Sequence, residues 1–171
     1  SGFGQTLYTF DPQLMYDQSG GFYDQDSLRS IHIDFLDPNY HSILQNSFFT
    51  APSYRIPATV TLNGVAHDSV GVRYKGNSTF CIPNDNGNPK VPYNLDMNYF
   101  ISGQKLMDYK KVKLANAFMD PTFVREYTAS TVYRKYLPTV EVNLAELHVQ
   151  GNYLGLFVST ESINKQFLQK H

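Results

Sequence analysis

The sequence predicts one α+β domain with a mostly antiparallel sheet and two to three helices. Several segments alternate apolar and polar residues, which is typical of strands with one buried face. Turn residues at Asn63-Gly64 and Gly151-Asn152 separate pairs of such segments and predict two β-hairpins. Aspartate followed by proline, at Asp37-Pro38 and Asp120-Pro121, marks two helix starts.

The alternation places the strands along the chain. The first begins at Ser30, where Ile31 and Ile33 alternate with His32. The other strands are expected in four segments, at residues 56–74, 91–97, 111–116 and 140–158. Residues 76–89 are predicted to be a loop, because they end in a run of turn-forming Asn, Asp and Gly.

Three segments carry helix signals. A short helix follows Asp37, and a longer one runs from Asp120 to just before Pro138. The longer helix has an apolar stripe that includes Phe123 and Tyr127. A last helix is predicted to begin near Ser162.

Length and composition fit a single folded domain. The chain has 171 residues, of which 42% are hydrophobic, enough to bury a substantial core. Residues 1–28 are rich in Gly, Asp and Gln and are expected to form an irregular arm. Residues 29–171 are expected to form the domain.

Charge argues against two classes of partner. Lys and Arg number 14 against 15 Asp and Glu, without a basic tract, so nucleic acid and anionic membranes are unlikely general partners. No apolar run approaches the roughly 20 residues of a transmembrane helix. We therefore expect no nucleic-acid partner and no transmembrane segment.

Familiar catalytic motifs are absent or incomplete. Residues 71–78 nearly match the phosphate-binding loop G-x-x-x-x-G-K-[ST], but Lys75 precedes the second glycine instead of following it. The histidines are scattered singly, and Cys81 lies in an apolar context without an activating neighbour. We therefore predict no catalytic residue and no metal ligand in this chain from motifs alone.

Several polar residues in apolar contexts form an ordered series of blocks. The blocks are Val70–Ser78, Lys90 before Tyr93, Lys113–Asn116, Asp120–Glu126, and Gly151–Phe157 with Glu161. This series resembles the CotH family of spore-coat and secreted proteins. The resemblance covers roughly residues 30–170, and its ordered spacing makes it more specific than any single motif.

The resemblance implies an activity and a fold. CotH-like proteins are atypical protein kinases that transfer phosphate from ATP, with Mg²⁺, to serine on protein substrates. It implies a kinase-like N-lobe followed by a second lobe that carries the catalytic and metal-binding aspartates. The chain would then be a nucleotide-binding N-lobe, truncated at its C-terminus and inactive alone, from a secreted, cell-surface or spore-coat protein.

The resemblance also suggests residues for the ATP site. Lys90, on a strand after a loop, is predicted to contact the ATP phosphates and to pair with Glu161, at the start of the last helix. Lys75 with Arg73, on one face of their strand beside Gly76, is the alternative phosphate contact.

Other roles remain open for several of these residues. Lys75 and Lys90 could simply border the sheet, with their charges in water. Asp120 and Arg125 are expected to be structural and to fix the central helix, and Arg125 with Glu126 reads most simply as a helix-surface pair.

Two further functions compete with the kinase hypothesis. One is a non-catalytic surface or adhesion module that binds a partner protein or glycan. The other is a metal- or carbohydrate-processing enzyme in which Asp24, Asp26 and Asp34 converge. The second is weaker, because loop aspartates usually act as caps and turn residues.

Overall fold

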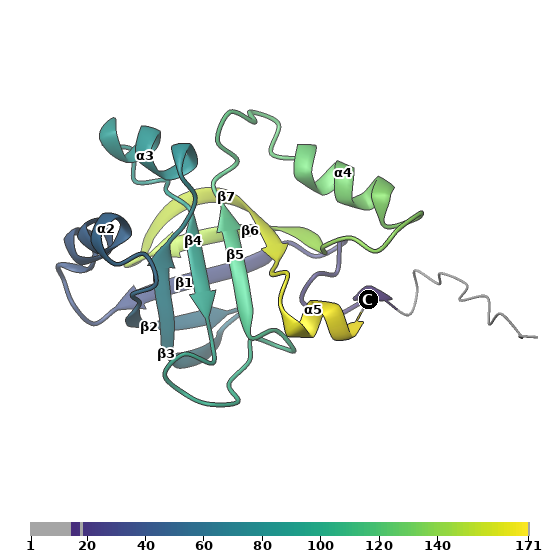
Figure 1. Ribbon diagram of the computed structural model, residues 1–171, viewed down its shortest axis with the longest axis horizontal. Coiled ribbons are helices and arrows are strands. Elements are labelled where there is room, and N and C mark those ends of the chain that lie inside the picture. Colours follow the sequence, from purple (N-terminus) through teal and green to yellow (C-terminus); the bar gives the residue numbers. More distant parts are fainter. Residues whose placement is uncertain (1–14, 18, 171) are drawn as a thin grey trace, which may run out of the picture.

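The computed structural model describes residues 15–17 and 19–170. In this part of the chain, seven strands close into a barrel in the order β1-β2-β3-β4-β5-β7-β6 (Figure 1). The strands are β1 (Arg29–Phe35), β2 (Ile56–Leu62), β3 (Val65–Tyr74), β4 (Tyr93–Asp96), β5 (Lys111–Ala115), β6 (Val142–Val149) and β7 (Asn152–Glu161).

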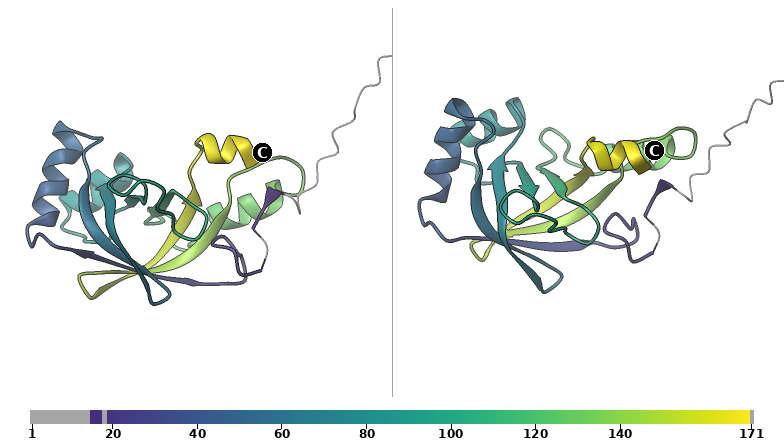
Figure 2. Two further views of the ribbon diagram at one scale, coloured as in Figure 1. Left: turned by 90° about the horizontal axis from the view of Figure 1, so that it is seen from below. Right: turned by 60° about the horizontal axis from the view of Figure 1, so that its bottom comes forward.

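The helices of the described region are short and lie outside the barrel. They are α2 (Tyr40–Thr50), α3 (Ser78–Asp85), α4 (Arg125–Tyr133) and α5 (Lys165–Lys170). In Figure 1, α2 and α3 lie on one side of the barrel, and α4 and α5 lie on the other. Figure 2 shows the same separation of α2 from α5 in two further views. No described helix is long and apolar enough to cross a membrane.

The predicted kinase-like α+β N-lobe with an open sheet is wrong, because the strands form a closed mixed barrel. Closure depends on β1 and β6, which pair in parallel with Ile31 opposite Leu147. Helix α4 buries little against the sheet, since Ser130 is its buried residue. The sheet instead buries its apolar face against itself.

Alternating side chains fill the barrel. Ile31 and Ile33 are fully buried, as their alternation with polar residues predicts. The described part of the N-terminal segment contributes to the same core. Phe22 and Tyr23 are 1% and 0% exposed, and the Tyr23 ring packs edge-on against Tyr109 with 4.7 Å between centroids.

Both predicted hairpins are confirmed. The turn between β2 and β3 has positive φ at Asn63 (47°) and Gly64 (85°), the conformation that Asn-Gly turns favour. The turn between β6 and β7 is shifted by one residue from the prediction and has positive φ at Gln150 and Gly151.

The predicted loop at 76–89 differs from the structure, because it contains helix α3. Turn-forming residues suggested a loop, but tertiary packing stabilises the helix. Phe80 is completely buried and stacks near Phe48, with 4.1 Å between ring centroids. The turn chemistry predicted from Asn86 and Gly87 appears directly after the helix.

Candidate functional site

A row of polar residues crosses the outer face of the barrel. Arg73 on β3 lies opposite Asn94 on β4, and Asn94 lies opposite Lys113 on β5. Lys113 in turn lies opposite Thr160 on β7. Because the alternate positions of β3, β4 and β5 carry buried apolar side chains, the row faces outward. We call Arg73, Lys75, Lys113 and Thr160 the polar face.

Lys75 extends this face just beyond the end of β3. Its backbone N–H donates to the Pro92 carbonyl at 3.1 Å, which continues the β3–β4 pairing. Burial lowers the pKa of the Lys75 ammonium, and the charges of Lys113 and Arg73 lower it further. Glu126 opposes this lowering. The charges of Arg73, Lys113 and Glu126 therefore all act on the Lys75 ammonium.

A hollow of about 310 Å³ lies next to Lys75. Its polar and charged lining side chains are Lys75, Thr79, Asn116, Asp120, Arg125 and Glu126. Asn116 is 6% exposed, and its side-chain oxygen has no hydrogen-bond partner among the described residues. Such an acceptor can take a hydrogen bond from a donor group of a ligand.

The turn after Lys75 is closely packed. Gly76 has φ of +89°, and a Cβ atom there would lie 2.0 Å from Thr79 Oγ1. The Asn116 side-chain amide donates to the carbonyls of Thr79 (2.9 Å) and Lys90 (2.8 Å). Asn116 therefore ties the start of α3 and the segment before β4 to the end of β5.

Glu126 reaches the polar face from the first turn of α4. Its Oε1 accepts a hydrogen bond from the Thr160 hydroxyl at 2.7 Å. The expected Arg125–Glu126 surface pair does not form, because Arg125 pairs with Asp120 instead, at 3.6 Å. Sequence reasoning missed Glu126 and Lys113 as site residues. Alternation along Lys111–Ala115 was the available signal for Lys113.

Asp120 organises the entry to α4. Its Oδ2 accepts a hydrogen bond from the Arg125 backbone N–H (3.0 Å), and its Oδ1 accepts one from the Thr122 hydroxyl (2.6 Å). The helix begins at Arg125, four residues after Pro121, where its first turn was predicted. Asp120 and Arg125 thus make the local contacts expected of structural residues.

The capping contacts of Asp120 predict a pH-dependent contribution to stability. The hydrogen bond from Thr122 is the largest cause that holds the pKa of Asp120 below its ordinary value. A lowered folded pKa stabilises the fold above about pH 4, and the contribution is lost as pH falls through the folded pKa. Asp120→Asn should therefore melt below wild type at pH 7 and approach it near pH 2.5. An equal deficit at both pH values, measured by thermal unfolding, would contradict this charge effect.

Lys90 lies in the connection before β4, not in the strand. Its Nζ is 4.2 Å from the ring centroid of Phe123 and 5.4 Å from that of Phe157. Burial lowers the pKa of the Lys90 ammonium. These contacts place the Lys90 ammonium against aromatic rings.

Glu161 is the last residue of β7 and precedes α5. It is 2% exposed, and its Oε2 accepts a hydrogen bond from the Glu141 N–H at 3.1 Å. Phe157, beside Lys90, precedes Glu161 by four residues on the same strand, about 13 Å at the usual rise per residue. The structure therefore does not bring Lys90 and Glu161 together, and their pairing stays a prediction.

The described residues show no ready metal site. In residues 15–17 and 19–170, no group of three or more His, Cys, Asp or Glu side chains could hold a metal ion. We assign no magnesium ligand and no step that involves the metal. The basic side chains beside the hollow do fit an anionic ligand.

The protein is a closed β-barrel, and the cationic side chains of the polar face lie on its outer surface. A profile of the family described as CotH kinase protein matches residues 72–171 of this chain, which include every residue of that face. The chain belongs to the CotH kinase family, and the resemblance found in the sequence is confirmed. Comparison with curated proteins gives no match.

Proposed function

We propose that the polar face contacts the phosphates of ATP in a protein kinase that phosphorylates serine on protein substrates. The observation that carries this proposal is the grouping of Arg73, Lys75 and Lys113 with Glu126. Membership of the CotH kinase family supports the use of a nucleotide. ATP, when bound, supplies the phosphoryl group that is transferred.

Each residue of the face has a distinct role in this proposal. The ammonium groups of Lys75 and Lys113 attract phosphate oxygens and donate hydrogen bonds to them. Glu126 opposes the effect of burial, which lowers the pKa of the Lys75 ammonium. Gly76 lacks a side chain and has the positive φ that the turn beside Lys75 requires.

Glu126, rather than Glu161, is the acid that this arrangement favours as partner of the phosphate-contacting lysine. Its carboxylate lines the same hollow as Lys75, whereas Glu161 lies four residues along β7 from Phe157, one of the rings that Lys90 contacts. In kinases such an acid orients a strand lysine toward the phosphates. The family resemblance assigns the catalytic aspartates to a second lobe, so ATP binding is the property to measure on this chain.

Lys75→Ala is expected to weaken ATP binding by about 10- to 100-fold, the range for a lost hydrogen bond to a charged group. Isothermal titration calorimetry with ATP, with and without magnesium, measures this loss. Lys135→Ala is the matched control, because Lys135 is an exposed lysine just after α4 and outside the polar face. Its affinity should equal that of wild type.

A second comparison separates the two candidate sites. Lys90→Ala should change ATP affinity by less than about twofold, well below the tenfold that 1.4 kcal/mol represents. Glu126→Gln should clearly reduce the affinity for ATP. If Lys90→Ala abolishes binding while Lys75→Ala leaves it unchanged, the polar face is not the phosphate site. Circular dichroism of each variant checks that the barrel is still folded.

A further inference from the structure

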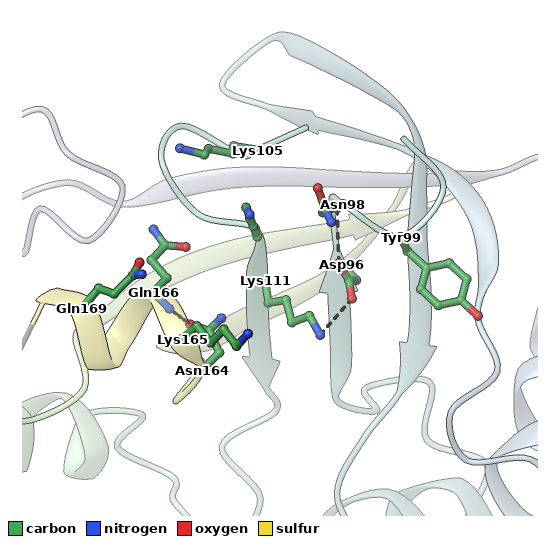
Figure 3. Close-up of a pocket in the computed structure, with 10 residues that line it drawn as sticks. Asp96, Asn98, Tyr99, Lys105, Lys111, Asn164, Lys165, Gln166 and Gln169 are labelled. Atoms are coloured by element: carbon green, nitrogen blue, oxygen red, sulfur yellow. Dashed lines mark hydrogen bonds and ion pairs between the residues drawn. The ribbon is translucent and has the colours of Figure 1, made fainter. Parts of the chain in front are cut away.

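A second hollow, of about 650 Å³, lies between the β4–β5 connection and α5. Figure 3 shows side chains from these segments around the hollow, with Lys165 on the α5 side and Lys105 on the loop. The lining contains four lysines, Lys105, Lys110, Lys111 and Lys165. We call these residues and the space between them the lysine pocket.

The lysine pocket has an excess of positive charge. Its lining contains one acid, Asp96, which is already engaged by Lys111 at 3.1 Å and by Arg55 at 3.9 Å. No acid in the described part of the chain forms an ion pair with Lys105, Lys110 or Lys165. Gathering these ammonium groups around one hollow costs repulsion that an anion would relieve.

Local contacts hold the two walls of the pocket together. The Gln166 side-chain amide on α5 donates to the Asp108 carbonyl of the β4–β5 connection at 2.7 Å. The Asn98 side-chain oxygen accepts a hydrogen bond from Gly103 N–H at 2.6 Å and closes the loop that carries Lys105. The lysines are thus presented from structured segments that lie far apart in the sequence.

Side-chain amides complete the lining. Asn164 uses its oxygen to accept hydrogen bonds from the N–H groups of Gln166 (2.9 Å) and Phe167 (3.1 Å). Its NH₂ group donates no hydrogen bond to any described residue. Gln169 also lines the pocket. Amide NH₂ groups and ammonium groups together form a set of donors suited to an acceptor with several oxygens.

We propose that the lysine pocket binds a phosphoryl group, either in a small free phosphate compound or on a phosphorylated serine of a protein segment. A phosphoryl group carries close to two negative charges and three acceptor oxygens, which several lysines can share. The pocket is separate from the hollow beside Lys75, although Lys111 lies only two residues from Lys113 of the polar face on β5. Lys111 lines the pocket and Ala115 lines the hollow beside Lys75, four residues or about 13 Å along β5.

Calorimetric titration with inorganic pyrophosphate tests the proposal on the whole chain. Wild type should bind pyrophosphate, and the double variant Lys105→Gln, Lys165→Gln should bind at least about tenfold more weakly. Both lysines are exposed, so the substitutions should leave the fold intact, which circular dichroism checks. Lys135→Gln, which removes one positive charge outside the pocket, should bind pyrophosphate with the same affinity as wild type.

Lys75→Ala distinguishes this proposal from the proposed ATP contact. Pyrophosphate binding that survives Lys75→Ala but fails in the double variant supports the lysine pocket, whatever happens to ATP affinity. Equal affinity of wild type and the double variant overturns the proposal. Loss of pyrophosphate binding in Lys75→Ala alone also overturns it, because the anion would then occupy the polar face.

Peptides identify the source of the phosphoryl group. A phosphoserine peptide that binds more tightly than pyrophosphate, while its unphosphorylated form does not bind, supports a protein-borne phosphate. Pyrophosphate binding without phosphopeptide binding supports a small free compound. Tyr99 and Phe100 are exposed beside the pocket, and exposed aromatic residues next to lysines could also contact a membrane. The binding experiment therefore includes vesicles that contain phosphatidylserine. Lysine-dependent vesicle binding without pyrophosphate binding overturns the proposal in favour of a membrane surface.

Discussion

Arg55→Ala is expected to lower the free energy of unfolding by about 3–5 kcal/mol, the usual cost of removing one partner from a buried charged network. Arg55 is 7% exposed, and its guanidinium donates to the carbonyls of Gly71 (3.0 Å) and Asn94 (2.9 Å). It also donates to the Asn94 side-chain oxygen at 2.8 Å and lies 3.9 Å from Asp96. Alanine would leave these buried oxygen atoms without the hydrogen bonds and the positive charge that Arg55 supplies.

The reason for this large effect is the burial of the charge. Desolvation lowers the pKa of Arg55 to about 10, and the Asp96 carboxylate opposes that lowering. Arg55 therefore stays charged at neutral pH. A lysine cannot reproduce the planar fork that contacts two carbonyls and a side chain together, so Arg55→Lys should recover only part of the lost stability.

Urea unfolding followed by circular dichroism measures the effect of Arg55. Lys111→Ala is the matched control, because Lys111 also pairs with Asp96 but its side chain is 44% exposed. An exposed ion pair contributes about 0–1 kcal/mol. If the two alanine variants lost equal stability, the buried guanidinium would not be the source of the effect.

Phe80→Ala is the second large prediction, with an expected loss of about 3–5 kcal/mol of unfolding free energy. The side chain of Phe80, a residue of α3, is completely buried. Its ring centroid lies 4.1 Å from that of Phe48 and 5.0 Å from that of Tyr74. Removing it would leave a cavity among these rings. The loss should also loosen the turn that carries Lys75 and Gly76, because α3 begins directly after it.

Ile82→Ala provides the control for Phe80 on the same helix. Ile82 is 47% exposed, and its truncation should change stability by less than about 1 kcal/mol. Thermal and urea unfolding of both variants are compared with wild type. A similar loss from Ile82→Ala would contradict the prediction, because truncating an exposed side chain to alanine, a better helix former, removes little burial and does not weaken the helix.

Local patterns predicted the strands and hairpins well. Alternation in residues 30–35 placed Ile31 and Ile33 inside, and Asn63-Gly64 supplied the positive φ of its turn. These features depend on neighbours in the sequence, so the sequence reveals them directly. Helix α3 was missed because its stability comes from burial of Phe80, which local turn residues do not report.

Part of the candidate site was also accessible from the sequence. Arg73 and Lys75 lie two residues apart and so share one face of the chain, as predicted. The prediction paired Lys90 with Glu161 by analogy with kinases. In the structure, Lys90 contacts the ring of Phe157, whereas Glu161 accepts a hydrogen bond from the Glu141 N–H. The contact of Glu126 with Thr160 joins residues 34 positions apart, which no local pattern encodes.

The sequence by itself determined the CotH family, the strand alternation and the cationic pair Arg73 and Lys75 at the end of β3, because these are written in local blocks. Only the tertiary structure decided that the sheet closes, that Glu126 lines the same hollow as Lys75, and that four lysines line one hollow beside α5. The physical reason is register: alternation tells which side chains share a face, but strand pairing over more than 100 residues, as between β1 and β6, decides which faces meet.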